Sequence, residues 1–222
     1  MELNITNLKA ILFDMDGTLI DSEPLHEKAF FSMLSETSYQ FDFHTLSQRF
    51  RGQTDIEVFK AINLEKPGTF SNNLDSLIDE KNQRMIKLLE NVMNEQIIIE
   101  GVYDTLKKLS GMNIKMALVS ASEEKIVNVL LAKTGLASFF RVILHRSSTY
   151  LSKPSPSPYF KAMRELKVKS NQTLIFEDSI TGVTSALDSG AKVIRVKTES
   201  NDQELTKFNH LETIANFNQL QF

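Results

Sequence analysis

Short apolar segments alternate with longer segments of helical periodicity over most of this 222-residue chain. Such alternation is typical of β–α units, whose strands lie parallel in one sheet while the helices cover its faces. The apolar segments are brief and consistent with strands that are buried on both faces. We predict strands at residues 10–13, 115–120, 142–144, 173–176 and 192–196.

The segments between the later strands carry apolar residues at steps of three and four, which is the spacing of a helix with one buried face. These helices are expected at residues 102–109, 123–132, 158–166 and 182–189. The fold class that we predict is therefore α/β, with a Rossmann-like parallel sheet core and helices on both faces of the sheet.

A long stretch between the first strand and the second interrupts this alternation. It holds three segments of helical pattern, 24–37, 55–62 and 73–93, and no convincing strand. An all-helical insertion of this size favours a separate small domain. We therefore predict a Rossmann-like core formed by residues 1–21 and 94–222, and an inserted helical domain formed by residues 22–93.

The composition excludes several kinds of function. The chain has no cysteine, which rules out disulfides, thiolate metal sites and a cysteine nucleophile. Its formal charge of −3 is not gathered into a block, which argues against a broad surface for nucleic acid or for an anionic membrane. The N-terminal residues do not resemble a signal peptide, and no apolar run approaches the length of a membrane span, so we expect a cytoplasmic protein.

Polar side chains follow four of the predicted strands, at the point where each strand ends. Ligands of open parallel sheets bind beyond the carboxyl ends of the strands, so we expect these side chains to converge. They are Asp14 and Asp16 after the first strand, Ser120 at the end of the second, Lys153 beyond the third, and Glu177 and Asp178 after the fourth.

The chemistry that this set favours is phosphoryl transfer. Two carboxylates as close as Asp14 and Asp16 repel one another unless a positive charge lies between them, and oxygen ligands of this kind suit Mg²⁺. Ser120 can donate a hydrogen bond to a phosphate oxygen, and Lys153 can neutralise the phosphate charge. One aspartate can then attack phosphorus while its neighbour transfers the proton of the leaving group.

Four short motifs occur in order along the chain: "DMDGT" at 14–18, Ser120 in "LVSAS", Lys153 in "SKPSP", and "EDSITG" at 177–182. With them the chain resembles the phosphohydrolases of the haloacid dehalogenase superfamily, in the subgroup of β-phosphoglucomutase-like enzymes and phosphatases. The resemblance spans essentially the whole chain. The helical insertion falls where one large subgroup of that superfamily carries a cap domain.

The resemblance implies four catalytic residues. Asp14 would be the nucleophile that becomes an aspartyl-phosphate, and Asp16 would act first as general acid and then as general base. Ser120 and Lys153 would hold the phosphoryl group.

The resemblance also implies a Mg²⁺ cofactor. Its ligands would be Asp14, the main-chain carbonyl of Asp16, and Asp178, with Glu177 either binding the metal or supporting the site. The substrate-binding residues implied by the family are Thr18, His26, Gly52, Gln53, Lys81 and Ala121.

Several of these residues also have a plain structural interpretation. His26 is equally well explained as a histidine on a helix surface, and Lys81 as a solvated lysine of an amphipathic helix. Gly52 can be a simple turn residue, and Glu177 can act through water or through its neighbours. Gly52 and Gln53 belong to the segment "RFRGQT" at 49–54, which resembles the family's substrate-selecting cap loop. Arg49 and Arg51 of this segment are further candidates for contacts with substrate.

The sequence favours a phosphatase over a phosphomutase. The "GTL" after Asp16 is similar to the phosphatases, and Asp55 stands where the mutases carry an arginine, so it would repel a second phosphate. Glu123 and Glu124 stand where the mutases tend to have lysine and asparagine. A dehalogenase is disfavoured because that chemistry lacks the second carboxylate, which is Asp16 here.

We therefore predict a Mg²⁺-dependent phosphatase that hydrolyses a small phosphorylated metabolite, with sugar phosphates as the leading class. The alternatives are a phosphomutase of the β-phosphoglucomutase type and a catalytically silent ligand-binding module on the same fold. No nucleic acid or membrane partner is expected. We expect a monomer, with a dimer as the alternative.

Overall fold

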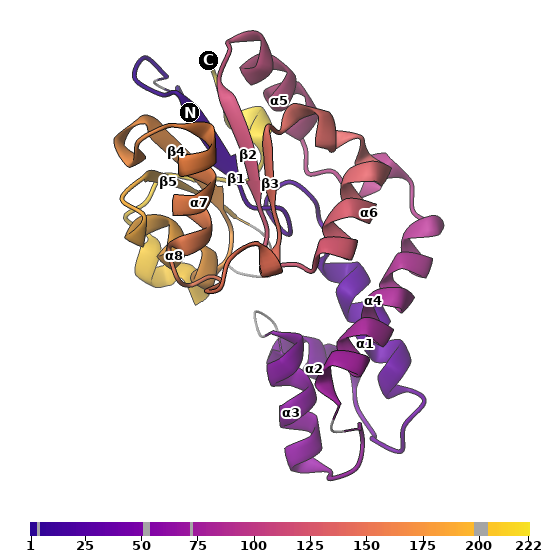
Figure 1. Ribbon diagram of the computed structural model, residues 1–222. Helices are drawn as coiled ribbons and strands as arrows, with labels where there is room; N and C mark the ends of the chain where they lie inside the picture. The colour runs from indigo at the N-terminus through magenta and orange to yellow at the C-terminus, as the bar shows by residue number, and fades with distance from the viewer. Residues whose placement is uncertain (4, 51–53, 72, 198–203) are drawn as a thin grey trace. The chain divides into compact units, whose positions relative to one another are not determined.

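The structure is a computed structural model that describes the chain except for residues 4, 51–53, 72 and 198–203 (Figure 1). It divides into two compact units. The larger unit consists of Met1–Asp21 together with Asn94–Phe222, and the smaller unit consists of Ser22–Met93.

The larger unit is built on one parallel sheet, which has six strands among the described residues, in the order β3-β2-β1-β4-β5-β6. This arrangement confirms the predicted Rossmann-like α/β fold. The sixth strand, which the sequence pattern did not predict, is only two residues long. The strands are β1 (Ala10–Phe13), β2 (Lys115–Val119), β3 (Val142–Leu144), β4 (Thr173–Glu177), β5 (Lys192–Val196) and β6 (Thr213–Ile214).

Helices cover both faces of the sheet, with α7 and α8 on one face and α5 and α6 on the other (Figure 1). Alternate residues of the buried strands explain this packing. Ala10 and Leu12 of β1 belong to the apolar cluster that contains α7 and α8, whereas the Phe13 ring stacks on Phe176 with a centroid distance of 5.3 Å. The helices are α5 (Val102–Gly111), α6 (Glu124–Thr134), α7 (Ser157–Leu166) and α8 (Ile180–Asp188).

Short segments of 3₁₀-helix complete the larger unit. They are η1 (Asn94–Gln96), η2 (Leu136–Phe139), η3 (Arg146–Ser148), η4 (Ser170–Gln172), η5 (Glu204–Phe208) and η6 (Phe217–Gln219).

The side of the sheet to which the chain adds strands changes at β1, and this change positions the site. From β1 the chain adds β2 and β3 on one side, and then crosses to add β4, β5 and β6 on the other side. The crevice beyond the carboxyl ends of β1 and β4 is therefore the switch point at which open α/β sheets bind ligands. Phe13 pairs with Phe176 in the register of β1 and β4, so the residues that follow them, Asp14 and Glu177, start side by side.

The smaller unit is all-helical in its described residues. Phe30 of α1 packs against Phe59 of α3, with ring centroids 5.4 Å apart, and Phe59 meets Phe70 edge to face. A capping box of Thr54 and Glu57 begins α3 and satisfies two backbone donors of its first turn. The helices are α1 (Glu23–Leu34), α2 (Phe43–Phe50), α3 (Asp55–Glu65) and α4 (Leu74–Glu90), of which α2 was not among the predicted segments.

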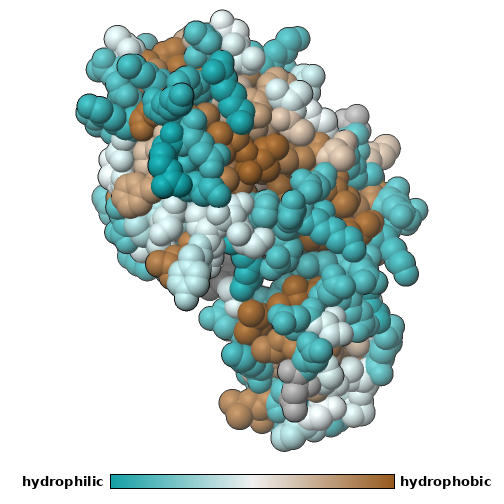
Figure 2. All heavy atoms as spheres, viewed as in Figure 1, coloured by the Kyte–Doolittle hydropathy of each residue, from teal (hydrophilic) through white to brown (hydrophobic). Residues whose placement is uncertain are grey.

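The surface seen in Figure 2 is hydrophilic over much of both units, and hydrophobic residues gather in separate patches. In the described part of the chain, no helix has the length and apolar character that a membrane crossing requires.

Candidate active site

Asp14 leaves the end of β1 in a fixed direction. Its backbone N–H donates to the carbonyl of Phe176 at 3.0 Å, which continues the ladder between β1 and β4. The chain then turns tightly at Gly17, which has a φ of +79°. A Cβ at Gly17 would lie 2.1 Å from Oδ2 of Asp178, so both the backbone conformation and the available space require glycine there.

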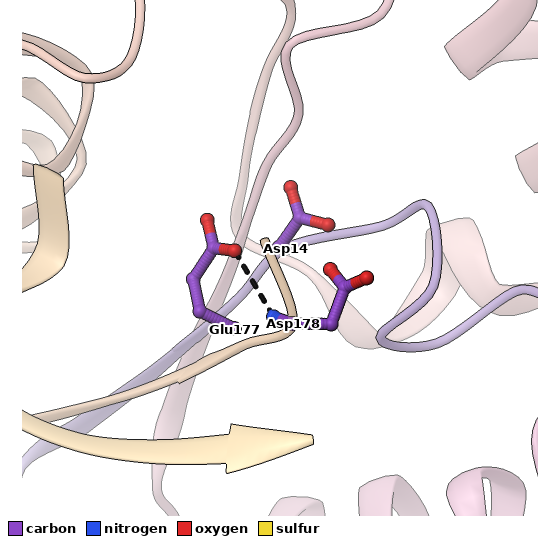
Figure 3. Close-up of side chains that lie close together, drawn as sticks. All are labelled: Asp14, Glu177 and Asp178. Carbon is purple, nitrogen blue, oxygen red and sulfur yellow. Dashed lines mark hydrogen bonds between the residues drawn. The ribbon is translucent and has the colours of Figure 1, made fainter. Parts of the chain in front are cut away.

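Three buried carboxyl groups gather at this point. Ligand atoms of Asp14, Glu177 and Asp178 all lie within 4.8 Å of one another, and Figure 3 shows the three side chains leaving the ends of β1 and β4. Acids packed so closely in a buried place repel one another, so they need a compensating cation.

Lys153 supplies part of that positive charge. Its Nζ donates to Oδ1 of Asp14 at 2.5 Å, to Oε1 of Glu177 at 2.6 Å and to the carbonyl of Val119 at 2.7 Å. Burial would lower the pKa of Lys153, but the charges of Asp14 and Glu177 outweigh burial and raise it above its usual value. The lysine therefore stays charged.

Asp14 is nevertheless poorly compensated. Burial raises its pKa from 3.8 to about 8; the charge of Lys153 opposes this rise, whereas the charges of Glu177 and Asp16 add to it. Lys153 thus offsets only part of the cost of burying ionised Asp14, as expected of a carboxylate built to face a further cation or a reacting centre.

Glu177 is held on both of its oxygens. The hydroxyl of Tyr159 donates to Oε1 at 2.6 Å, next to Lys153, and the backbone N–H of Asp178 donates to Oε2 at 3.1 Å (Figure 3). A Cβ at Gly182 would lie 2.0 Å from this carboxyl group, so Glu177 packs directly on the first turn of α8. Because Oε1 of this fixed carboxyl group also accepts from Lys153, Glu177 orients Lys153. This role does not depend on whether Glu177 contacts a metal ion.

Tyr159 is a residue that the sequence reasoning missed. It is fully buried on α7, and Nζ of Lys153 lies 5.1 Å from the centroid of its ring. A single sequence offers only a weak clue to it, namely a tyrosine six positions after the motif lysine.

Thr18 was predicted to bind substrate. In the structure its hydroxyl is 3.2 Å from Oδ1 of Asp178, to which it donates, and it is buried. Thr18 thereby fixes the orientation of the Asp178 carboxylate, a contact that the motif alone did not indicate.

Asp16 is bound by the loop that follows β2. Its Oδ2 accepts hydrogen bonds from the hydroxyl of Ser122 at 2.6 Å and from that of Ser120 at 3.3 Å. Ser122 was not among the predicted site residues, although it lies within the "LVSAS" motif. Ala121, which was predicted to contact substrate, is exposed between these two serines.

The predicted residues of the helical unit form a cluster of their own. Lys81 is buried, and its Nζ lies 2.9 Å from Nδ1 of His26 and 2.5 Å from Oδ2 of Asp55. Lys81 is therefore not a solvated lysine. Arg49 forms an ion pair with Glu65 on the surface of the same unit.

The remaining predicted residues of this unit, Gly52 and Gln53, lie outside the described residues, as does Arg51.

The donor set of the larger unit fits a small divalent cation. Asp14 and Asp178 offer hard carboxylate oxygens within the spacing of a shared ion, and the raised pKa of Asp14 marks the place where positive charge is needed. Mg²⁺ prefers this kind of site, with few carboxylates and the remaining positions left to water and phosphate oxygens.

The fold and the site together define an α/β protein with a buried acidic centre at the switch point of its sheet. Residues 11–196 match the family described as haloacid dehalogenase-like hydrolase. The chain belongs to this family, and the predictions of the family, the fold and a hydrolase enzyme are confirmed.

Several of the matching relatives are named as phosphatases. The chain is 27% identical over 195 residues to fructose-1-phosphate phosphatase YqaB of Escherichia coli, a match that covers 84% of this chain and 95% of that protein. It is 31% identical over 193 residues to phosphoglycolate phosphatase of Pseudomonas syringae pv. tomato, covering 84% and 68%.

Solved structures match nearly the whole chain. A family IA, variant 3 hydrolase of the same family from Entamoeba histolytica has a TM-score of 0.84 at 27% identity, with 97% of this chain and 96% of that chain covered. CbbY of Rhodobacter sphaeroides, solved with xylulose-(1,5)bisphosphate, has a TM-score of 0.81 at 22% identity and 96% coverage of both chains, and this similarity shows the shared fold alone.

Proposed function

We propose that the chain is a Mg²⁺-dependent phosphatase that hydrolyses the phosphate monoester of a small metabolite through an aspartyl-phosphate on Asp14. The observation that carries the proposal is the buried group of Asp14, Glu177 and Asp178, with Nζ of Lys153 at 2.5 Å from Asp14. Sugar phosphates are the leading substrate class, and the relative named fructose-1-phosphate phosphatase supports this choice.

Asp14, Asp178 and the main-chain carbonyl of Asp16 would hold the metal ion. When bound, Mg²⁺ supplies the positive charge that offsets the buried acids and the charge of the phosphoryl group.

The protein's own groups divide the remaining work. Lys153 binds a phosphoryl oxygen beside Asp14, and Glu177 keeps its Nζ in place. The carboxylate of Asp14 forms a bond to phosphorus while the bond from phosphorus to the alcohol oxygen breaks. Asp16 gives its proton to the leaving oxygen, and later takes a proton from the water that releases phosphate from Asp14.

Residues 22–93 would serve as a cap that selects the substrate and excludes water from unproductive attack. Within this unit, the charge of Lys81 is balanced by Asp55 at 2.5 Å. The carboxylate of Asp55 offsets the positive charge of Lys81 and would itself repel a second phosphate. This pairing favours hydrolysis of a monophosphate over the mutase reaction, which passes through a bisphosphate.

The proposal is tested with a panel of fructose 1-phosphate, phosphoglycolate, pyrophosphate and β-glucose 1-phosphate, the last with a bisphosphate primer. Each compound is assayed with Mg²⁺ and again with excess chelator, with Asp14→Asn as the inactive control. Phosphate release that needs both Mg²⁺ and Asp14 supports the proposal. Conversion of glucose 1-phosphate to its isomer would identify a mutase, and saturable binding without turnover would identify a silent binding module.

A further inference from the structure

Ser122 makes a short contact that neither the motif nor the proposed mechanism uses. Its hydroxyl donates to Oδ2 of Asp16 at 2.6 Å. The main chain of Ser122 is held on both sides, because its N–H donates to Oγ of Ser120 at 3.0 Å and its carbonyl accepts from the N–H of Arg146 at 2.9 Å. The Ser122 hydroxyl is thus presented to Asp16 from a fixed backbone.

Asp16 needs such a partner because its main chain alone does not orient its carboxyl group. The turn is fixed through Gly17, whose N–H donates to the carbonyl of Ile20 at 2.8 Å. The torsion that rotates an aspartate carboxyl group is nevertheless broad, so its oxygens exchange places easily unless one of them is bound.

Ser120 cannot provide this anchor during the reaction. Its hydroxyl carries one proton and lies at 3.3 Å from Oδ2 of Asp16, so it makes the longer of the two contacts. If Ser120 donates that proton to a phosphoryl oxygen, it no longer donates to Asp16. Ser122 then remains as the hydroxyl that holds the carboxyl group.

We propose that Ser122 is the positioning residue for Asp16: it anchors Oδ2 and thereby makes Oδ1 the oxygen that gives and takes the proton. The inference rests on the proposed function. An oxygen that accepts a short hydrogen bond is less available to a proton than its partner oxygen. Ser122 therefore selects which oxygen of Asp16 faces the substrate.

The proton balance follows from this assignment. In the first step Asp14 forms its bond to phosphorus, the bond to the alcohol oxygen breaks, and that oxygen takes the proton from Oδ1 of Asp16. In the second step a water loses a proton to Oδ1 as its oxygen bonds to phosphorus, and the bond from phosphorus to Asp14 breaks. Throughout both steps Oδ2 of Asp16 accepts the hydrogen bond from the hydroxyl of Ser122.

A comparison of two leaving groups tests this role. The probes are fructose 1-phosphate, whose alkoxide needs a proton, and 4-nitrophenyl phosphate, whose phenolate leaves without one. Because kcat/KM reports the steps up to the release of the alcohol, it isolates the proton donation by Asp16. Ser122→Ala should lower kcat/KM for fructose 1-phosphate by about 10- to 100-fold, a part of the usual general-acid contribution, and should change it less than about threefold for 4-nitrophenyl phosphate.

Two further variants separate positioning from structure. Ser122→Thr keeps the hydroxyl and should restore most of the lost kcat/KM, and Ser138→Ala removes an exposed hydroxyl of η2 as a matched control. Equal losses for both probes would show a merely structural role for Ser122. An unchanged kcat/KM for fructose 1-phosphate in Ser122→Ala would overturn the proposal.

Crystal structures of the wild type and of Ser122→Ala, both soaked with inorganic phosphate so that Ser120 has a phosphate oxygen to bind, provide a readout that needs no turnover. The carboxyl group of Asp16 should rotate away from its wild-type orientation in the variant, and the same orientation in both proteins would refute the anchor. If the wild type hydrolyses neither these probes nor any compound of the panel, the proposed function and the proton-transfer role fail together. A rotated Asp16 would then still establish the anchor itself.

Discussion

The metal-free protein should lose stability as the pH rises from about 4 to about 8, and Asp14→Asn should remove most of that loss. Burial raises the pKa of Asp14 from 3.8 to about 8, with Lys153 opposing the rise and the charges of Glu177 and Asp16 adding to it. Below pH 3.8 Asp14 is protonated in the folded and in the unfolded chain. Between the two pKa values only the folded chain keeps the proton, so the free energy of unfolding falls as the pH rises.

The structure sets the size of this effect. The folded and unfolded pKa values differ by about 4, and each unit corresponds to about 1.36 kcal/mol, which gives an upper limit of about 5 kcal/mol. Any rearrangement of Lys153 or entry of water at the end of β1 on ionisation of Asp14 would relieve part of this cost. A loss of roughly 2–3 kcal/mol between pH 5 and pH 8 is therefore expected.

The assay is denaturant unfolding in excess chelator at pH 5 and pH 8, for the wild type, Asp14→Asn and the control Asp104→Asn, which alters an exposed acid of α5. Asp14→Asn should lose less than about 1 kcal/mol over this range and should be more stable than the wild type at pH 8. Added Mg²⁺ should stabilise the wild type at pH 8 more than it stabilises the variant. Equal pH dependence in the wild type and in Asp14→Asn would refute the reasoning.

Three other substitutions test single contacts by denaturant unfolding with an unchanged m-value. Gly182→Ala should cost about 2–3 kcal/mol and at least tenfold in kcat, because the new Cβ would lie 2.0 Å from the Glu177 carboxyl group; full activity would contradict this. Tyr159→Phe should cost about 2 kcal/mol, because it removes a buried donor 2.6 Å from Glu177, and a neutral result would show that the hydroxyl contributes nothing. Asp55→Asn leaves buried Lys81 without its carboxylate and should destabilise the helical unit by about 1–2 kcal/mol, since Asp55 is 36% exposed; a more stable variant would exclude the pairing as a stabilising contact.

Local pattern was enough to predict most of the fold. The predicted limits of β1, β3 and β5 agree with the structure. β1 and β3 are short apolar runs bounded by polar residues, and β5 is rich in β-branched residues although it contains Lys192 and Arg195. The pattern missed β6, Thr213–Ile214, which is too short to show a period and exists through its pairing with β5. It also missed α2, Phe43–Phe50, an amphipathic helix of only eight residues.

The site residues also differ in how much of their role local sequence indicates. Asp14, Lys153 and Asp178 were predicted because they follow different strands that end at the same edge of the sheet, where oxygen ligands and a lysine together suit a metal ion and a phosphate. Little in the sequence around Ser122 or Tyr159 predicts a role in the site. A serine and a tyrosine are common in loops and helices, and only their distances to Asp16 and Glu177, both 2.6 Å, distinguish them.

The sequence by itself determined which residue types follow which strands. An acid pair follows the first strand, and a serine, a lysine and a second acid pair follow later strands. Only the tertiary structure decided which atoms share a partner, as Asp14 and Glu177 share Lys153, and Lys81 joins His26 to Asp55. The physical reason is that pairing energies depend on separations of a few ångströms between residues far apart in the chain. Periodicity fixes faces and ends of elements, whereas packing fixes those separations.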